Sequence, residues 1–366
     1  MRIGVPKEIK SQESRVGMTA GVVSALTERG HQVLVETNAG LGIGLSDDAY
    51  RAAGAVVVPT AEDVFEAQLI VKVKEPQAVE IARLRPHHIL FTYLHLAPDP
   101  AQANGLLESG ATCIAYETIT DHKGRLPLLA PMSQVAGRMS VQVGADALLA
   151  PAGGPGILLG GVPGVAAAKV MILGGGVSGT HAAEMAVGHR ADVTLYDIDA
   201  DRLAQLDTQF EGRLKTRFST REAILEGLRE ADLVIGAVLV TGAAAPKLVR
   251  RTDLATMKPR SVLVDIAIDQ GGCFETSRPT THADPIYVVD GILHYCVANM
   301  PGAAPVTSTH ALCAATAPYI LKLADHGLDD ALARDSGFAA GLNVRAGKLT
   351  CRPVAHALGM EDRLAA

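Results

Sequence analysis

The feature that most constrains the fold is a glycine-rich turn between an apolar stretch and a helical one. Residues 169–186 read KVMILGGGVSGTHAAEMA, in which Gly174, Gly176 and Gly179 have the spacing GxGxxG. The first glycine of this pattern allows a tight turn, the second lets the backbone approach a pyrophosphate, and the third lets helix and strand pack closely. The pattern predicts a strand, a turn and a helix whose N-terminus binds a dinucleotide.

An acidic residue at the end of the next predicted strand indicates which dinucleotide binds. Asp197 closes the stretch VTLYD, after the glycine motif. A carboxylate at this place accepts hydrogen bonds from ribose hydroxyls and repels a 2′-phosphate, which favours NAD over NADP. Arg202 is a contrary signal, because arginine accommodates a 2′-phosphate. Glycine-rich turns also occur without a ligand, but the ordered series of strand, glycines, helix, strand and acid favours a dinucleotide site.

Strand-like and helix-like segments alternate along the chain, first before residue 120 and again from residue 168. Such alternation predicts right-handed βαβ units and parallel sheets. We therefore predict an α/β protein with two Rossmann-like domains. A dinucleotide-binding domain of residues 130–305 is inserted into a substrate domain built from residues 1–129 and 306–366. From residue 308 onward the chain is expected to be helical.

Composition excludes several classes of protein. The chain has 366 residues, of which 48% are hydrophobic, and a net charge of −6. This charge argues against non-specific nucleic-acid binding, which needs a basic surface. The N-terminus has no signal peptide, and glycines and prolines break the longest uncharged stretch, so no membrane segment is expected. The scattered cysteines predict free thiols of a cytoplasmic protein.

Two lysines end a predicted strand in the segment LIVKVKEP, residues 69–76. Because side chains alternate along a strand, Lys72 and Lys74 share one face. They are either solvated or placed to meet an anion. Solvation is the favoured interpretation for Lys72, whereas Lys74, at the last position, is better placed for an anion. Arg15 taken alone is a surface residue, and His87 and His88 are expected in a surface loop.

Further candidate reacting groups also follow predicted strands. His95 comes after the apolar run ILFTYL and is either a buried, hydrogen-bonded side chain or a proton-transfer group. Asp265 and Asp269 lie in the segment SVLVDIAID. Ligands of open α/β sheets bind at the carboxyl ends of strands, which is where these side chains are predicted.

Segments along nearly the whole chain resemble the alanine dehydrogenase/pyridine nucleotide transhydrogenase family, and its NAD-dependent alanine dehydrogenases in particular. They are MRIGVPKEIKSQESRVGMT, VKVKEP, LFTYLHLA, PMSQVAGRMSVQVGA, GGVPGV, ILGGGVSGTHAAEMA, DLVIGAVL, VDIAIDQGGCFETSRPTTH and HYCVANMPGAAPVTSTHAL. DIAIDQGGCFETS and HYCVANMPG are far more specific than the glycine motif. The resemblance implies reversible oxidative deamination of L-alanine to pyruvate and ammonium with NAD, in a cytoplasmic homohexamer.

The resemblance also implies roles for residues at matching positions. Arg15 and Lys74 match the family's substrate-binding arginine and lysine, and His95 and Asp269 match its acid/base residues. His95 and Asp269 fall in different predicted domains, so the active site is expected to assemble when the cleft closes. The implied cofactor contacts are Ser133, Gly174, Gly176, Val177, Gly179, Asp197, Arg202, Ser219, Val238, Leu239, Ile266, Ala267, Ile268, Asp269, Arg278, Val297, Ala298, Asn299 and Met300.

Two departures from the family pattern bear on these expectations. A loop that usually reads VLIPGAKAPKL has Thr241 and Ala244 in place of its proline and lysine. Some members hold a divalent metal with a Glu…His pair; here His326 is present but Lys322 replaces the acid, so no such metal is expected. Three alternatives stay open: a different oxo acid and amine, the NAD-binding subunit of a transhydrogenase, and an NAD sensor without activity.

Overall fold

The computed structural model describes residues 1–238 and 245–365, and the chain forms two compact units. Unit 1 consists of Met1–Met132 and Ala304–Ala366, and unit 2 of Ser133–Ala303. Unit 1 is therefore built from both ends of the chain, and the sequence of unit 2 lies between its two parts.

Unit 1 is a twisted sheet with helices on both faces. Its strands are β1 (Arg2–Val5), β2 (Gln32–Glu36), β3 (Val56–Val58), β4 (Leu69–Val71), β5 (Ile89–Thr92), β6 (Thr112–Ala115), β14 (Leu342–Arg345) and β15 (Lys348–Leu349). Their order in space is β15-β14-β6-β5-β4-β1-β2-β3. Among the strands β1 to β6, every pairing is parallel. The strand β14 is antiparallel to both of its neighbours, β6 and β15.

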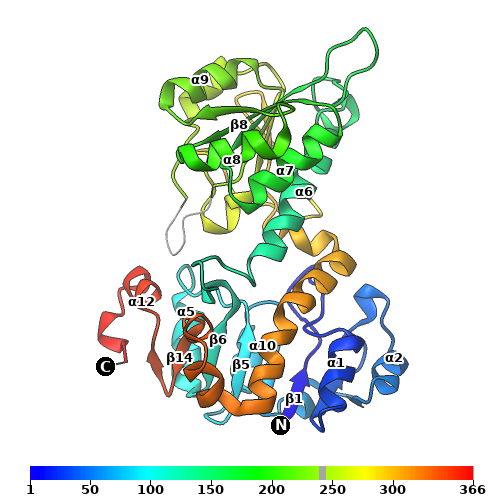
Figure 1. Cartoon of the computed structure of the whole chain (residues 1–366), viewed down its shortest axis with the longest axis vertical. Coiled ribbons are helices and arrows are strands. Elements are labelled where there is room, and N and C mark those ends of the chain that lie inside the picture. The colour runs from blue at the N-terminus through cyan, green and yellow to red at the C-terminus, as the bar shows by residue number, and fades with distance from the viewer. Residues whose placement is uncertain (239–244, 366) are drawn as a thin grey trace. The chain divides into compact units, whose positions relative to one another are not determined.

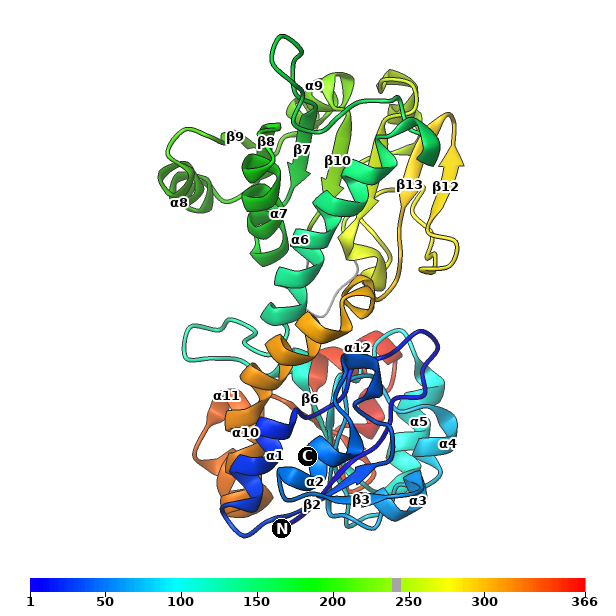
Figure 2. The same ribbon diagram turned by 90° about the vertical axis from the view of Figure 1, so that its right-hand side faces the viewer.

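The helices of unit 1 are α1 (Ala20–Thr27), α2 (Asp47–Ala52), α3 (Ala61–Val64), α4 (Ala78–Ile81), α5 (Pro100–Ser109), α10 (Pro305–Ala333), α11 (Ser336–Ala339) and α12 (Arg352–Leu358). In Figure 2, α4 and α5 lie on one side of the sheet and α10 lies on the other. The core beneath α4 and α5 contains buried side chains from both layers, such as Leu84, Leu90 and Leu106. Gly327 interrupts α10 with a non-helical backbone (φ 75°, ψ 174°).

Unit 2 repeats this architecture. Its strands are β7 (Lys169–Leu173), β8 (Asp192–Asp197), β9 (Lys215–Phe218), β10 (Leu233–Gly236), β11 (Val262–Asp265), β12 (Ile286–Val289) and β13 (Ile292–Tyr295), in the order β12-β13-β11-β10-β7-β8-β9. The helices are α6 (Ala130–Ala147), whose first residues belong to unit 1, α7 (Val177–Gly188), α8 (Ala200–Phe210) and α9 (Arg221–Glu230). Figure 1 shows α7, α8 and α9 around the strands. The ladder is parallel except for β12, which pairs antiparallel with β13.

The central strand β7 explains why unit 2 has two apolar cores. Val170 and Ile172 are buried in the core that α6 and α7 cover, and Met171 and Leu173 in the core that α9 covers. Because side chains alternate, a parallel strand with helices on both faces is apolar at consecutive positions. The run VMIL therefore places β7 at the centre of the sheet.

When the strands are numbered within each unit, unit 1 has the order 3-2-1-4-5-6-7-8 and unit 2 the order 3-2-1-4-5-7-6. Both therefore contain the doubly wound order 3-2-1-4-5. The predicted α/β class with two Rossmann-like domains and mostly parallel sheets is confirmed. The expectation that the chain is entirely helical after residue 308 is wrong, because β14 and β15 extend the sheet of unit 1. Their pairing depends on β6, which is distant in sequence.

Candidate active site

The glycine loop of unit 2 lies where the strand order reverses, between β7 and β10. Gly174 directly follows β7 in a left-handed conformation (φ 100°), and a Cβ there would come within 2.8 Å of the carbonyl oxygen of Ala237, which follows β10. The crevice at such a reversal is the ligand site of open α/β sheets. The loop thus places a backbone turn at the expected position of a pyrophosphate.

The other two glycines of the motif have distinct structural roles. Gly176 precedes α7 as its N-cap without a side-chain cap, and a Cβ there would meet nothing within 4 Å. The first N–H groups of α7 therefore face open space that can admit an anion. At Gly179 a Cβ would lie only 1.8 Å from the Gly174 carbonyl oxygen, so only glycine lets α7 pack on the loop.

Asp197 ends β8 beside the same loop. Its Oδ2 accepts a hydrogen bond from the Gly175 N–H at 2.6 Å, and its Oδ1 accepts one from the Asp199 N–H at 2.9 Å. Arg202 donates from Nε to the Gly175 carbonyl at 2.7 Å and from an Nη to Thr180 Oγ1 at 2.7 Å. The structure therefore brings both predicted ribose-end residues into direct contact with the glycine loop.

The remaining predicted cofactor residues lie mostly in the loops after the strands of unit 2. Ser219 follows β9 and donates its N–H to the Asp197 carbonyl at 2.9 Å, and Val238 follows β10. Ile266, Ala267, Ile268 and Asp269 form a 3₁₀ helix after β11, and Val297, Ala298, Asn299 and Met300 follow β13. Ser133 lies on α6, Arg278 stacks on Tyr287 at 4.1 Å, and Val177 is the first residue of α7. Leu239, Thr241 and Ala244 lie outside the described residues.

Asp265 shapes the loop that carries Asp269. Its buried carboxylate accepts hydrogen bonds from the N–H groups of Ala267 and Cys273 and from the Ser277 hydroxyl. Burial raises the pKa of Asp265, and these hydrogen bonds oppose the rise. Asp269 itself is exposed at the end of this turn. The two aspartates therefore differ, since the first organises the backbone and the second has an exposed side chain.

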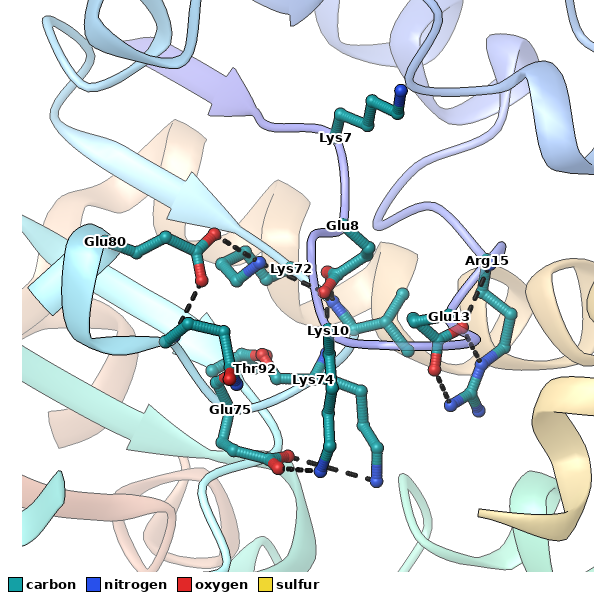
Figure 3. Close-up of polar contacts among 12 residues, drawn as sticks. Lys7, Glu8, Lys10, Glu13, Arg15, Lys72, Lys74, Glu75, Glu80 and Thr92 are labelled. Atoms are coloured by element: carbon teal, nitrogen blue, oxygen red, sulfur yellow. Dashed lines mark hydrogen bonds and ion pairs between the residues drawn. The ribbon is translucent and has the colours of Figure 1, made fainter. Parts of the chain in front are cut away.

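In unit 1, Lys72 is fully buried, so its predicted solvation is wrong. Its Nζ lies 3.0 Å from Glu8 Oε2 and 2.7 Å from Glu80 Oε1, and the side chains of all three residues are at most 2% exposed. Burial alone lowers the pKa of Lys72, but the two carboxylates outweigh it and raise that pKa above its ordinary value. Figure 3 shows the amino group between the two acids. Lys72 is a charged residue of the core.

The buried acids also fix the segment that carries Lys74. Glu8 Oε1 accepts the N–H of Val73 at 2.7 Å and that of Lys74 at 3.4 Å, and the Thr92 hydroxyl donates to the Lys74 carbonyl at 2.8 Å. The Lys74 amino group points toward Glu75, with Nζ 3.9 Å from Oε2. This segment follows β4, next to the end of β1, where the strand order of unit 1 reverses.

Arg15 is a buried residue with an acidic partner, so the surface reading of this residue alone is wrong. Arg15 is 2% exposed. Its Nε donates to Glu13 Oε1 at 2.7 Å, and one Nη donates to Glu13 Oε2 at 2.6 Å. The other Nη lies 3.0 Å from the sulfur of Met132. Burial lowers the pKa of Arg15, but Glu13 outweighs it and raises the pKa, so the guanidinium remains charged.

His95 is half-buried just after β5, in a left-handed backbone conformation (φ 46°). Its ring stacks on Tyr93 with centroids 5.6 Å apart and an interplanar angle of 8°. Burial raises the pKa of Tyr93, and the positive charge of nearby Arg15 opposes this rise. Tyr93 thus connects the predicted proton-transfer residue with the predicted carboxylate-binding residue.

His88 corrects another expectation, because it is buried and not part of a surface loop; His87 is exposed. The His88 Nδ1 accepts the Arg85 N–H at 2.8 Å, so its Nε2 carries the proton and donates to the Phe65 carbonyl at 2.7 Å. Sequence reasoning also missed Glu8, Glu13 and Glu117. The partners of Glu8 and Glu117 are distant in sequence, so the local sequence carries no signal for them. The partner of Glu13 is Arg15, two residues away, so an acid and a base at this spacing are a local signal that could have been used.

Within residues 1–238 and 245–365, no three His, Cys, Asp or Glu side chains gather in an arrangement that could hold a metal ion. In the same part of the chain, no helix is long and apolar enough to cross a membrane.

Fold and geometry define a class of protein: a two-unit α/β fold with a glycine loop of the GxGxxG type where the strand order of unit 2 reverses, and with buried basic side chains in unit 1. Residues 4–136 match the N-terminal domain, and residues 140–352 the C-terminal domain, of the family described as alanine dehydrogenase/PNT. The chain belongs to this family.

Individual relatives agree with this assignment over nearly the full length. The chain is 60% identical to an alanine dehydrogenase of Halomonas elongata, covering 99% of this chain and 98% of the relative. It is 53% identical to one of Bacillus subtilis, covering 99% and 96%. A solved L-alanine dehydrogenase matches with a TM-score of 0.94 at 50% identity, covering 98% of this chain and 99% of that one. A transhydrogenase from Sinorhizobium meliloti, at 24% identity and a TM-score of 0.81, shares the fold.

Proposed function

We propose that this protein is an enzyme that interconverts L-alanine with pyruvate and ammonium, using NAD. The observation that carries the proposal is its identity of 50–60% with alanine dehydrogenases over nearly the whole chain. In the oxidative direction, L-alanine, NAD⁺ and water give pyruvate, ammonium, NADH and a proton. The transhydrogenase alternative has in its favour the joint family description and a shared fold, but the solved transhydrogenase is only 24% identical to this chain.

The residues of unit 2 fit a dinucleotide. The open space at Gly176, the uncapped start of α7 and the left-handed Gly174 form a cradle that side chains would fill. The Asp197 carboxylate beside the loop supports NAD over NADP, because it repels a 2′-phosphate. The other cofactor contacts that the resemblance implies, from Ser133 to Met300, are proposed to bind the same NAD molecule. When bound, NAD⁺ accepts the hydride that leaves the substrate Cα.

Arg15 and Lys74 are proposed to bind the substrate carboxylate. Both are buried, and a glutamate accepts a hydrogen bond from the backbone N–H of each. Positioning of reactants is worth about 7–11 kcal/mol in favourable cases. Glu13 pairs with Nε and one Nη of Arg15, and we propose that the guanidinium faces the substrate on the side of its other Nη, beside Met132. Met132 then lies near the methyl group of alanine and limits the size of the side chain that fits.

His95 and Asp269 are proposed to handle protons. Loss of hydride from Cα leaves an iminium group, to which water adds; His95 removes a proton from that water and returns it to the departing amine. A histidine suits this role because its pKa lies near neutral pH, and such transfer typically contributes ~10²–10⁴-fold. Asp269, exposed on its turn, balances charge or orients water. These roles rest on the family resemblance.

The proposal also covers location and assembly, where the resemblance implies a cytoplasmic homohexamer. Light scattering coupled to size-exclusion chromatography measures the assembly directly.

The activity is tested by following NADH absorbance with pyruvate and ammonium. We expect rapid oxidation that requires ammonium and prefers NADH to NADPH. A panel of other 2-oxo acids and amines tests substrate choice. NADH binding without turnover on any of these would overturn the proposal.

A further inference from the structure

His95 has an unusual backbone that must be held by its surroundings. At φ 46° it lies in the left-handed region, which a residue with a Cβ rarely adopts. Such conformations persist only where neighbouring groups over-determine them, and they concentrate at functional sites. In a regular continuation of β5 the chain would stay extended; here it turns at His95, and the ring stacks on Tyr93.

The carboxylate of Glu117 holds this turn. Glu117 lies in the 3₁₀ turn Tyr116–Thr118 after β6, the neighbour of β5 in the sheet. Its Oε1 accepts the His95 N–H at 2.6 Å, and both of its oxygens lie 3.2 Å from the Leu94 N–H. Hydrogen bonds to a charged acceptor are short and about twice as strong as neutral ones. Two consecutive N–H groups are thereby fixed by one side chain.

A second side chain holds the same segment from its other side. Gln102, buried on α5, donates from Nε2 to the Leu94 carbonyl at 2.8 Å. Glu117 and Gln102 together satisfy both the N–H and the C=O of the residue before His95. Glu117 contacts the backbone of residues 94 and 95. Glu117 therefore influences the imidazole of His95 by fixing the position of the chain that carries it.

We propose that Glu117 is a positioning residue for His95: it fixes the left-handed turn and so sets the place from which the imidazole transfers protons. This inference rests on the proposed function and on the role of His95 in it. Glu13 pairs with the Arg15 guanidinium and Glu8 accepts the Lys74 N–H, whereas the hydrogen bonds of Glu117 go to Leu94 and His95. The inference therefore predicts a change in proton transfer with little change in substrate binding.

Glu117→Gln is the first variant to measure. It keeps the size of the side chain but replaces one acceptor oxygen by an amide donor, which opposes the Leu94 or the His95 N–H. We expect kcat for pyruvate amination to fall at least tenfold, and by no more than the ~10²–10⁴-fold that proton transfer contributes. The KM for pyruvate should stay within about twofold. An unchanged kcat in an active protein would overturn the inference.

A double-mutant cycle with His95→Ala separates positioning from general destabilisation. If Glu117 acts through the imidazole, Glu117→Gln should not lower the residual rate of His95→Ala further. Equal fold losses in both backgrounds would show that Glu117 acts independently of His95 and would overturn the inference. A wild-type protein without ammonium-dependent NADH oxidation would instead overturn the proposed function itself.

Asp47→Asn is the matched control. The Asp47 carboxylate also holds the N–H of a left-handed residue in unit 1, Asn38 (φ 62°), at 2.8 Å, and it has no role in the proposed site. We expect this variant to lose stability with kcat unchanged. Should Glu117→Gln not fold, Gln102→Met tests the same segment. A smaller fall in kcat at constant KM is expected there, and wild-type kcat would overturn the inference.

Discussion

At the scale of single residues, Lys72 illustrates how burial changes the meaning of a charge. Its amino group lies between Glu8 and Glu80 with no exposed surface. Removing one partner of a buried ionic group is strongly destabilising, because the remaining charges lose their compensation. The same network holds the Lys74 segment, so stability and the proposed substrate binding share residues here.

We expect Lys72→Met to lower the free energy of unfolding by about 3–5 kcal/mol, because it leaves two carboxylates buried together. The control is Lys322→Met, which removes a partly exposed ion pair with Asp335 and should cost less than about 1 kcal/mol. Denaturant unfolding of both variants measures the difference. Equal losses would mean that the buried network does not stabilise unit 1.

Asp197 provides a prediction about coenzyme choice. Asp197→Ser removes the carboxylate beside the glycine loop, and a hydrogen bond to a charged group contributes about 1.5–3 kcal/mol. We therefore expect kcat/KM for NADH to fall about tenfold or more, while NADPH becomes a better substrate because its phosphate is no longer repelled. Steady-state kinetics with both coenzymes test this. If the ratio of kcat/KM for NADH to that for NADPH does not change, the adenine-side ribose does not bind beside Asp197.

At the scale of elements, α7 depends on one glycine and tolerates change at another. At Gly179 a Cβ would lie 1.8 Å from the Gly174 carbonyl oxygen, but at Gly188, at the end of the same helix, it would meet nothing within 4 Å. Overpacking typically costs about 1–3 kcal/mol. We expect Gly179→Ala to destabilise unit 2 by at least that much and to weaken NADH binding.

Gly188→Ala serves as the matched control, since alanine favours a helix by up to about 1 kcal/mol relative to glycine. It should leave stability and NADH binding unchanged or slightly improved. Thermal unfolding and NADH fluorescence titration distinguish the two variants. Similar behaviour of both would contradict the close packing of α7 on the loop.

How much could be predicted from sequence depended on whether a signal was local. The turn at Gly174 and the strand VMIL have local signals, and both lie where predicted. The strand β14 has no comparable signal, since its pairing with β6 forms only in the folded chain. Burial of Lys72 likewise depends on partners from two other segments. The site roles carried over by resemblance remain predictions.

At the scale of the whole molecule, each unit contains a buried histidine that must stay neutral. His88 in unit 1 accepts a backbone N–H on Nδ1, and His294 in unit 2 lies 2.7 Å from the Thr276 hydroxyl and 3.0 Å from the Ile292 carbonyl. Burial lowers the pKa of both histidines, although each has a backbone hydrogen bond that opposes this. Protonation would therefore disfavour the fold in both units.

Stability should consequently depend on pH below the ordinary histidine pKa of 6.5. With folded-state pKa values below this, the unfolded chain binds protons first as pH falls. The contribution is present above pH 6.5 and is lost as pH falls through the folded-state values. We expect hydrogen exchange to show weakened protection at pH 5.5 relative to pH 7.5. His88→Gln should reduce the difference in protection between the two pH values in unit 1 only. An unchanged difference in unit 1 would show that protonation of His88 does not destabilise that unit.

The discontinuity of unit 1 has a consequence for biosynthesis. A ribosome releases β6 before unit 2 and releases β14, its neighbour in the sheet, only afterwards. During translation of residues 133–303 the nascent sheet of unit 1 thus has an open edge at β6, and such edges template aggregation. Unit 2, continuous in sequence, can fold as soon as it emerges. We expect premature termination between residues 303 and 342 to leave chains with a folded unit 2 and an aggregation-prone unit 1.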